Sequence, residues 1–94
     1  RPREPREHRL YVHVRDTLNS YHARPQSGTA AAEAGLKGIK ASATAGAVAA
    51  VRALLRKSAT GLDVDAALIL PAPRVPGADD GGTWFEVIVD DAAA

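Results

Sequence analysis

The chain has 94 residues and no cysteine, and it carries 12 Lys/Arg against 11 Asp/Glu, a formal net charge of +1. This length suits a single domain with one hydrophobic core, which must be mainly aliphatic because the chain has only two Tyr, one Trp and one Phe. The absence of cysteine excludes a disulfide framework, a zinc–thiolate site and a thiol nucleophile. No apolar run approaches the roughly 20 residues of a membrane-spanning helix. We therefore expect an intracellular protein with no membrane partner; the sequence does not separate cytoplasm, nucleus and organelle.

The charges are distributed unevenly along the chain. Residues 1–57 contain 11 Lys/Arg against 4 Asp/Glu, giving +7, whereas residues 58–94 contain one Arg against 7 Asp/Glu, giving −6. A basic first part and an acidic second part favour one face that is suited to an anionic partner. The alternative, equally acceptable at this point, is that the charges only keep a small protein in solution.

The chain begins with nine residues that contain two prolines and alternating charges without an apolar period, which predicts a flexible basic tail. We place one domain at 10–91 and a short C-terminal tail at 92–94. Residues 10–14 (LYVHV) alternate between aliphatic and other side chains. This alternation predicts a half-buried strand with its three aliphatic residues inward.

Two helical stretches are predicted to follow this strand. Asp16 or Thr17 caps a short helix that carries Leu18 and Tyr21 on one face, and Pro25 interrupts it. The segment TAAAEAG then resumes the helix, and its glycine ends it.

The clearest helix is predicted at 45–57, after a brief strand at 38–42, with Ser42 or Thr44 as its cap. Its apolar residues recur at helical spacing and form a buried stripe, and two arginines one turn apart point the other way. The stripe consists of Val48, Val51, Leu54 and Leu55, and the arginines are Arg52 and Arg56.

Two more strands are predicted near the C-terminus. LDVDAALIL, at 62–70, alternates with its even-numbered residues inward, and WFEVIVD, at 84–90, buries Phe85 and its two valines. The long segment between them, 71–82, predicts a hairpin with a projecting arm. The predicted order is β-α-β-α-β-β, which corresponds to a two-layer α/β sandwich.

Residue patterns typical of catalysis or metal binding are not found. His8, His13 and His22 have no carboxylate at a diagnostic spacing, and we interpret them as surface histidines. The serines lack a nucleophile-elbow context, and the segment GLKG lacks the phosphate-loop pattern. Two pairs of aspartates have no third ligand and no calcium-loop pattern beside them. We therefore expect a protein that is not an enzyme and that carries no cofactor and no metal.

The segment GIKASATAGAVAAVRALLRK resembles the core of the Alba superfamily, in which a strand ending in Lys-Ala, a turn and a helix follow one another. LYVHVRDTLNSY resembles the first strand and helix of that family, and LDVDAALIL and WFEVIVDD match its last two strands in order and spacing. The resemblance spans about 10–91. It implies an Alba-like fold and a dimer, formed with itself or with an Alba-like paralogue, that binds RNA or DNA without strong sequence preference.

The resemblance also implies where the nucleic acid would lie: near the first strand–helix loop, around the Lys-Ala turn and along the hairpin arm. With the arginines of the long helix added, the candidate nucleic-acid-binding residues are Arg15, Lys37, Lys40, Ser42, Thr44, Arg52, Arg56 and Arg74. Where the family commonly has Arg-Gly-Arg, this chain has Ser-Ala-Thr, which removes two positive charges and favours RNA. Three or four phosphate contacts per protomer predict a log–log salt slope of about −3 to −4.

A second hypothesis stays open at the level of the sequence. The loss of arginine at the turn and the acidic arm favour a structural subunit of a larger ribonucleoprotein complex. Such a subunit would keep the fold for protein–protein contact, and its nucleic-acid binding would be weakened.

Overall fold

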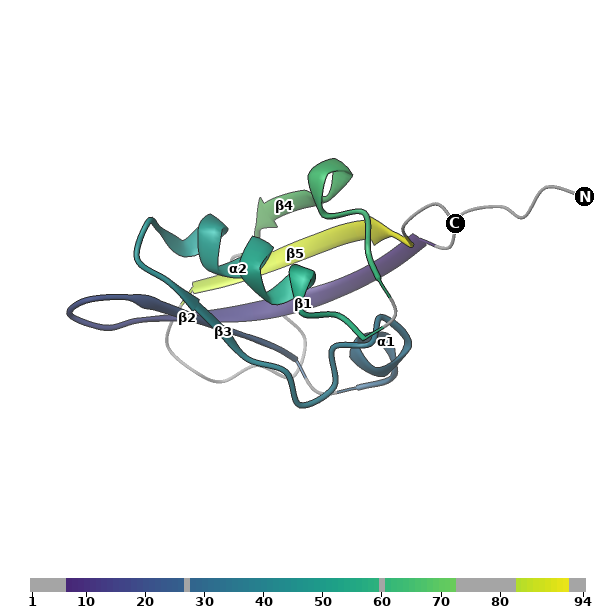
Figure 1. Ribbon diagram of the computed structural model, residues 1–94, viewed down its shortest axis with the longest axis horizontal. Coiled ribbons are helices and arrows are strands. Elements are labelled where there is room, and N and C mark those ends of the chain that lie inside the picture. Colours follow the sequence, from purple (N-terminus) through teal and green to yellow (C-terminus); the bar gives the residue numbers. More distant parts are fainter. Residues whose placement is uncertain (1–6, 27, 60, 73–82, 92–94) are drawn as a thin grey trace, which may run out of the picture.

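The computed structural model describes residues 7–26, 28–59, 61–72 and 83–91 (Figure 1). Within these residues, five strands form one wholly antiparallel sheet in the order β3-β2-β1-β5-β4, and two α-helices accompany it. The strands are β1 (Glu7–Asp16), β2 (Tyr21–Pro25), β3 (Ala41–Ala43), β4 (Leu68–Pro71) and β5 (Thr83–Asp90). The helices are α1 (Thr29–Glu33) and α2 (Ala47–Arg56), and a 3-10 turn, η1, covers Val64–Ala66. The predicted single α/β domain is confirmed at this level.

The first two strands form a hairpin that extends beyond the rest of the sheet (Figure 1). The Thr17 N–H donates to the Ser20 carbonyl at 2.8 Å, and the Thr17 hydroxyl donates to the same oxygen at 3.0 Å. Asp16 pairs with Tyr21, so the chain has already turned back where a helix was predicted. The predicted helix is wrong because Asp, Asn and Ser favour a turn, and only two apolar residues supported a helical period.

The element order is therefore β-β-α-β-α-β-β, with the 3-10 turn before the fourth strand, rather than β-α-β-α-β-β. The order that the Alba resemblance implies is wrong at its first helix. The predicted helix in TAAAEAG is confirmed as α1, and Gly35 follows it with a φ of 71°. The predicted strand at 38–42 lies slightly later, as β3.

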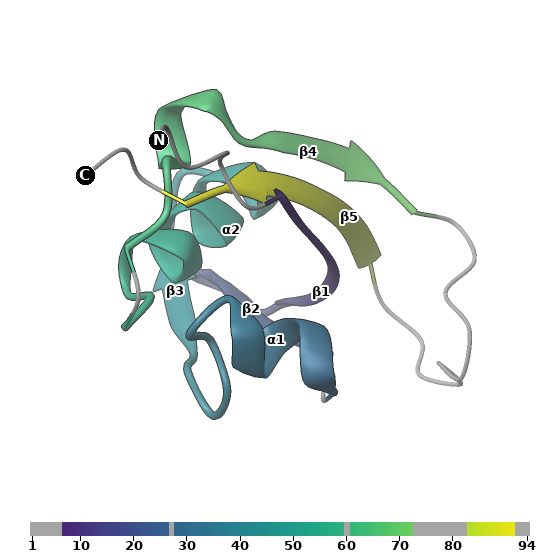
Figure 2. The same ribbon diagram turned by 90° about the vertical axis from the view of Figure 1, so that its right-hand side faces the viewer.

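The core lies between one face of the sheet and α2, which is held inside the curve of the sheet (Figure 2). The predicted inward residues of the first and last strands and most of the predicted helix stripe are confirmed as buried. These residues are Leu10, Val12, Val14, Phe85, Val87, Val89, Val51, Leu54 and Leu55. Full burial of each valine or leucine side chain contributes about 1.5–3 kcal/mol.

The start of α2 differs from the prediction. Gly46 is the N-cap residue and no side chain caps the helix, so the predicted cap by Ser42 or Thr44 is wrong. Ser42 belongs to β3, which holds it in the sheet away from the helix end. Val48, in the first turn, is 41% exposed, and Ala50 is buried in its stead.

The segment LDVDAALIL is not one continuous strand. Leu62 forms an isolated bridge with Asp91, and η1 then interrupts the strand before β4 begins. One turn of 3-10 helix shifts the alternation by one residue, so the predicted inward residues Leu68 and Leu70 are 56% and 43% exposed. Ile69 packs against the core instead.

The predicted flexible tail at 1–9 is wrong at its end, because residues 7–9 belong to β1. Glu7 pairs with Asp90 and His8 pairs with Val89 of β5. The rest of this tail, the projecting arm at 73–82 and the C-terminal tail at 92–94 lie outside the described residues. In the part of the chain that the structure describes, no helix is long and apolar enough to cross a membrane.

Candidate functional site

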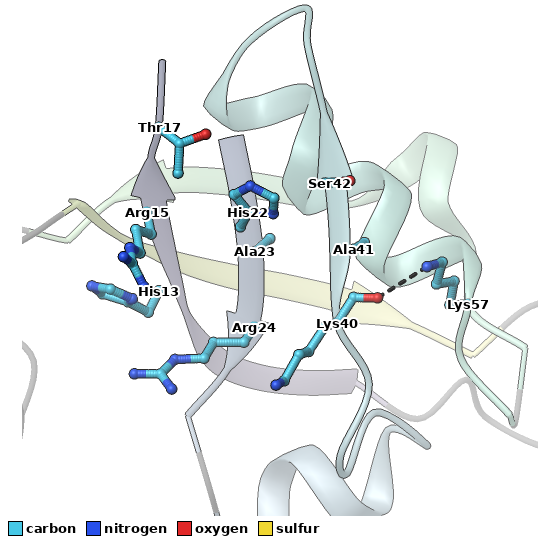
Figure 3. Close-up of a pocket in the computed structure, with 10 residues that line it drawn as sticks. All are labelled: His13, Arg15, Thr17, His22, Ala23, Arg24, Lys40, Ala41, Ser42 and Lys57. Atoms are coloured by element: carbon cyan, nitrogen blue, oxygen red, sulfur yellow. Dashed lines mark hydrogen bonds between the residues drawn. The ribbon is translucent and has the colours of Figure 1, made fainter. Parts of the chain in front are cut away.

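The face of the sheet that points away from α2 carries a hollow of about 580 Å³ over β1, β2 and β3 (Figure 3). Its lining is basic, and none of the described residues that line it is acidic. The lining residues are His13, Arg15, Thr17, His22, Ala23, Arg24, Lys40, Ala41, Ser42 and Lys57. The hollow therefore gathers four positive side chains and two imidazoles on a protein whose net charge is only +1.

The register of the strands arranges these side chains in two rows across the sheet. In the first row Arg15 pairs with His22, and His22 pairs with Ser42. In the second row His13 stands between Arg24 on β2 and Trp84 on β5. Residues two apart on a strand share a face, so the rows lie about 7 Å apart. Opposite partners within a row have Cβ atoms about 4.5–5.5 Å apart.

A short sequence pattern produces this arrangement. His-Val-Arg at 13–15 and His-Ala-Arg at 22–24 stand on either side of the hairpin loop. The middle residue of each triplet, Val14 or Ala23, is buried, so the histidine and the arginine project from the other face. Because the two strands are antiparallel, each histidine faces the arginine of the other triplet. Arg24 and the exposed His22 were missed as site residues because this pairing requires the hairpin.

The far side of the hollow depends on a contact between α2 and the sheet. Lys57, the C-cap residue of α2, donates from Nζ to the Lys40 carbonyl at 3.0 Å (Figure 3). Lys40 directly precedes β3, so this bond ties the helix end to the edge strand. Both lysines line the hollow. Lys57 was missed as a site residue because no local pattern predicts a contact over this sequence distance.

Two of the three histidines are buried, which makes the prediction of surface histidines wrong for them. His8 is 5% exposed, and its Nε2 lies 2.7 Å from the Asp91 Oδ1. His13 is 6% exposed, and its ring centroid lies 4.8 Å from that of Trp84, with 55° between the planes. Both lie where β5 flanks β1, and the sequence could not reveal this neighbour. Only His22 is exposed as predicted.

The exposed His22 belongs to a small network of hydroxyl groups at the hairpin loop. Its Nε2 lies 3.0 Å from the Ser20 Oγ, and that Oγ lies 3.3 Å from the Thr17 Oγ1. The network holds the imidazole beside the arginine of the first row. The described residues contain no group of three or more His, Cys, Asp or Glu that could hold a metal ion.

The structure brings together only some of the candidate residues predicted from the sequence. Arg15, Lys40 and Ser42 all line the hollow. Lys37 and Thr44 are exposed but lie outside it, in the segments before and after β3.

The remaining candidates are the arginines of α2 and of the predicted arm. Arg52 donates from Nη1 to the Val64 carbonyl at 3.0 Å, so it secures η1 on the helix side of the sheet. Arg56 is exposed on α2 and does not line the hollow, and Arg74 lies outside the described residues.

Comparisons with known proteins give no relative from which a role could be carried over. No family model, curated protein or solved structure matches the chain. The chemistry of the site therefore has to be argued from the hollow itself. Arginine forks, lysine ammonium groups and a serine hydroxyl, with no acidic side chain among the described lining residues, form a site that can hold an extended anion.

Proposed function

We propose that this protein binds nucleic acid, largely without sequence preference, through the hollow over β1, β2 and β3. The basic lining of the hollow carries the proposal, because it contains four cationic side chains and no acidic one among the described residues. Arginine presents a planar fork that can bind two phosphate oxygens at once, and lysine binds phosphate as a point charge. Contacts of this kind position a nucleic acid without reading its sequence.

The placement of the acidic residues supports the same proposal. β1 and β5 are antiparallel, with Glu7 opposite Asp90 at one end and Val14 opposite Thr83 at the other. The Asp63 N–H donates to the Asp90 carbonyl at 2.9 Å, which adds another carboxylate to the first end. Glu7 and Arg15 are eight residue steps apart along β1, a distance of about 27 Å. Asp16 lies beside Arg15 at the hairpin end, and Arg9 pairs with Glu7 at the opposite end. The cations of the hollow outnumber Asp16, so we expect an approaching polyanion to be attracted to the hairpin end.

The protein would act without catalysis or cofactor, and as a dimer that presents two hollows to one nucleic acid. The Alba resemblance supports the same class of ligand and the same dimer. The proposal of nucleic-acid binding rests on the hollow and not on that resemblance, because a hairpin replaces the first helix of the implied fold. The dimer is supported by the resemblance alone. Sedimentation at twice the monomer mass is the expected result, and a monomer at micromolar concentration would contradict the dimer.

The binding test is a fluorescence anisotropy titration with labelled single- and double-stranded RNA and DNA over a series of salt concentrations. Four neutralised phosphates predict a log–log slope of about −3 for a single strand. Lys40→Glu should weaken binding and flatten this slope. Lys37→Glu is the matched control, since it makes the same charge change at an exposed residue outside the hollow. No salt-dependent binding to any of these oligonucleotides would overturn the proposal.

A second candidate function is protein–protein contact within a larger ribonucleoprotein complex. Leu68 and Leu70 are exposed on the edge strand β4, and Leu18 is fully exposed at the tip of the hairpin. Exposed apolar residues on an unpaired strand edge favour association with another chain. This candidate predicts that Leu68→Lys with Leu70→Lys abolishes association with a partner while the anisotropy titrations stay unchanged.

A further inference from the structure

We infer that the protein binds single-stranded nucleic acid, with phosphates in the hollow and a base stacked at Trp84, which lies beside the lining residue His13 and is not itself part of the lining. This inference rests on the proposed function and names its ligand more closely. It starts from the second row, in which His13 has Arg24 as its partner on one side and Trp84 on the other. The second row thus has a cation on β2 and an aromatic side chain on β5, with His13 of β1 between them, all on one face of the sheet.

The spacing of this row suits one nucleotide. Neighbouring strands lie about 4.8 Å apart, so the Cα atoms of Arg24 and Trp84 are about 10 Å apart. His13 fills the space between them, and its ring packs against the indole at 4.8 Å between centroids. His13 is almost fully buried whereas Trp84 is partly exposed, so the imidazole supports the indole from within the sheet. The indole is then the part of this pair that a ligand can reach.

The chemistry of Trp84 favours stacking over hydrogen bonding. Its Nε1 is buried and has no hydrogen-bond partner among the residues that the structure describes, so whatever part of the indole reaches the surface is ring carbon. A hydrocarbon surface cannot distinguish bases by their donors and acceptors, but every base can stack on it. Contact at Trp84 is therefore compatible with the absence of sequence preference.

The next row fixes the direction in which the ligand lies. Tyr11, two residues before His13 on the same face, is partly exposed and pairs with Glu86 of β5. The carboxylate of Glu86 repels phosphate, so the backbone of the ligand stays over the arginines. The bases then point toward Trp84 on β5, and Tyr11 on β1 offers a second aromatic ring.

A duplex cannot make the same contacts. Its bases are stacked within the helix, so it can offer only phosphates to the hollow unless base pairs open. Base–aromatic stacking is worth about 1–3 kcal/mol per base, which corresponds to about 5- to 150-fold in affinity. We therefore expect single strands to bind more tightly than a duplex with the same number of phosphates.

The direct test uses the intrinsic fluorescence of Trp84, the only tryptophan of the chain. The intact protein is titrated with a ten-nucleotide oligothymidylate and with an abasic oligonucleotide of the same length and charge. We expect oligothymidylate to quench Trp84 and to bind about 5- to 150-fold more tightly, with a similar salt slope for both. Equal affinities without quenching would overturn the stacking inference and leave phosphate binding intact. If neither oligonucleotide binds, the proposed function itself fails.

Two variants separate stacking from folding. Trp84→Phe keeps an aromatic ring and should retain most of the preference for oligothymidylate, whereas Trp84→Leu keeps only apolar bulk and should lose it. Both are measured by anisotropy with labelled oligonucleotides, and thermal unfolding followed by circular dichroism shows whether each variant is folded. A folded Trp84→Leu that still prefers oligothymidylate to the abasic strand would overturn the inference.

Discussion

The two ends of the sheet use the same residue types in opposite ways. At the hairpin end, His22 is exposed beside Arg15 and in a hollow that also contains Arg24. At the other end, His8 is buried against the carboxylate of Asp91. The local partner therefore distinguishes the two histidines: one belongs to a basic surface, and the other makes a partly buried contact with a carboxylate.

The two ends of β1 are also expected to serve different purposes, binding at the hairpin end and stability at the other. β1 runs from the acidic end to the basic end, and its inward residues build one continuous core beneath both. A change at the acidic end should therefore alter the free energy of unfolding and leave binding intact. A change on the outer face at the hairpin end should do the reverse.

The largest expected effect comes from reversing the charge of the hairpin end. Arg15→Glu combined with Arg24→Glu removes two charge-assisted contacts to phosphate, each worth about 1.5–3 kcal/mol. Affinity for a labelled single strand should fall at least about 100-fold by anisotropy. The control combines Lys37→Glu with Arg56→Glu, which makes the same charge change outside the hollow. Equal losses in the two double variants would show that net charge, and not the hollow, determines binding.

A smaller effect, on stability alone, is expected at the acidic end. Asp91→Ala leaves the buried His8 without the carboxylate that its Nε2 contacts, which should lower the free energy of unfolding by about 1–3 kcal/mol. Urea denaturation measures this loss, and affinity for a single strand should stay unchanged. Asp91→Asn keeps an acceptor oxygen and should cost less. If both variants are as stable as the natural sequence, the His8–Asp91 contact contributes nothing measurable.

The parts of the fold that the sequence predicted correctly have uninterrupted periods. Leu10, Val12 and Val14 alternate without a break, and 84–90 does the same, so both strands and their inward faces were identified. The helix at 47–56 has its apolar residues at helical spacing. In these segments, local pattern and tertiary packing favour the same structure.

The parts that were predicted wrongly depend on interactions outside the local pattern. The turn at 17–20 lies between two strands in which inward and outward residues alternate. The spacing of Leu18 and Tyr21 also fits a helix, so the turn was predicted as part of a helix. The 3-10 turn of η1 shifts the phase of 62–70 in a way that hydropathy does not signal. The candidate site was predicted least completely. Its residues come together through cross-strand pairing, and the sequence alone does not show which strands pair.

A smaller effect on affinity and stability is expected when the contact between α2 and the edge strand β3 is removed. Lys57→Met removes the bond to the Lys40 carbonyl and one positive charge of the hollow, while it keeps a long apolar side chain. A single exposed hydrogen bond contributes about 0.5–1.5 kcal/mol, so stability should fall slightly and affinity by a few-fold. Lys57→Arg should restore the charge and most of the affinity. A Lys57→Met variant that binds as tightly as the natural sequence would place Lys57 outside the binding surface.

The smallest effect is expected at the tip of the hairpin, where Leu18 is fully exposed. Leu18→Asn removes an apolar side chain that buries nothing and adds a residue that favours turns, so the free energy of unfolding should change by less than about 0.5 kcal/mol. The loop is closed by Thr17 and Ser20, which the substitution leaves in place. If thermal unfolding and nucleic-acid affinity stay unchanged while the protein associates less with itself or another chain, the exposed leucine serves protein contact. The hairpin end would then combine a basic face for the polyanion with an apolar tip for a partner. If association is also unchanged, the tip has no part in assembly, and the exposed leucines of β4 are the next residues to test.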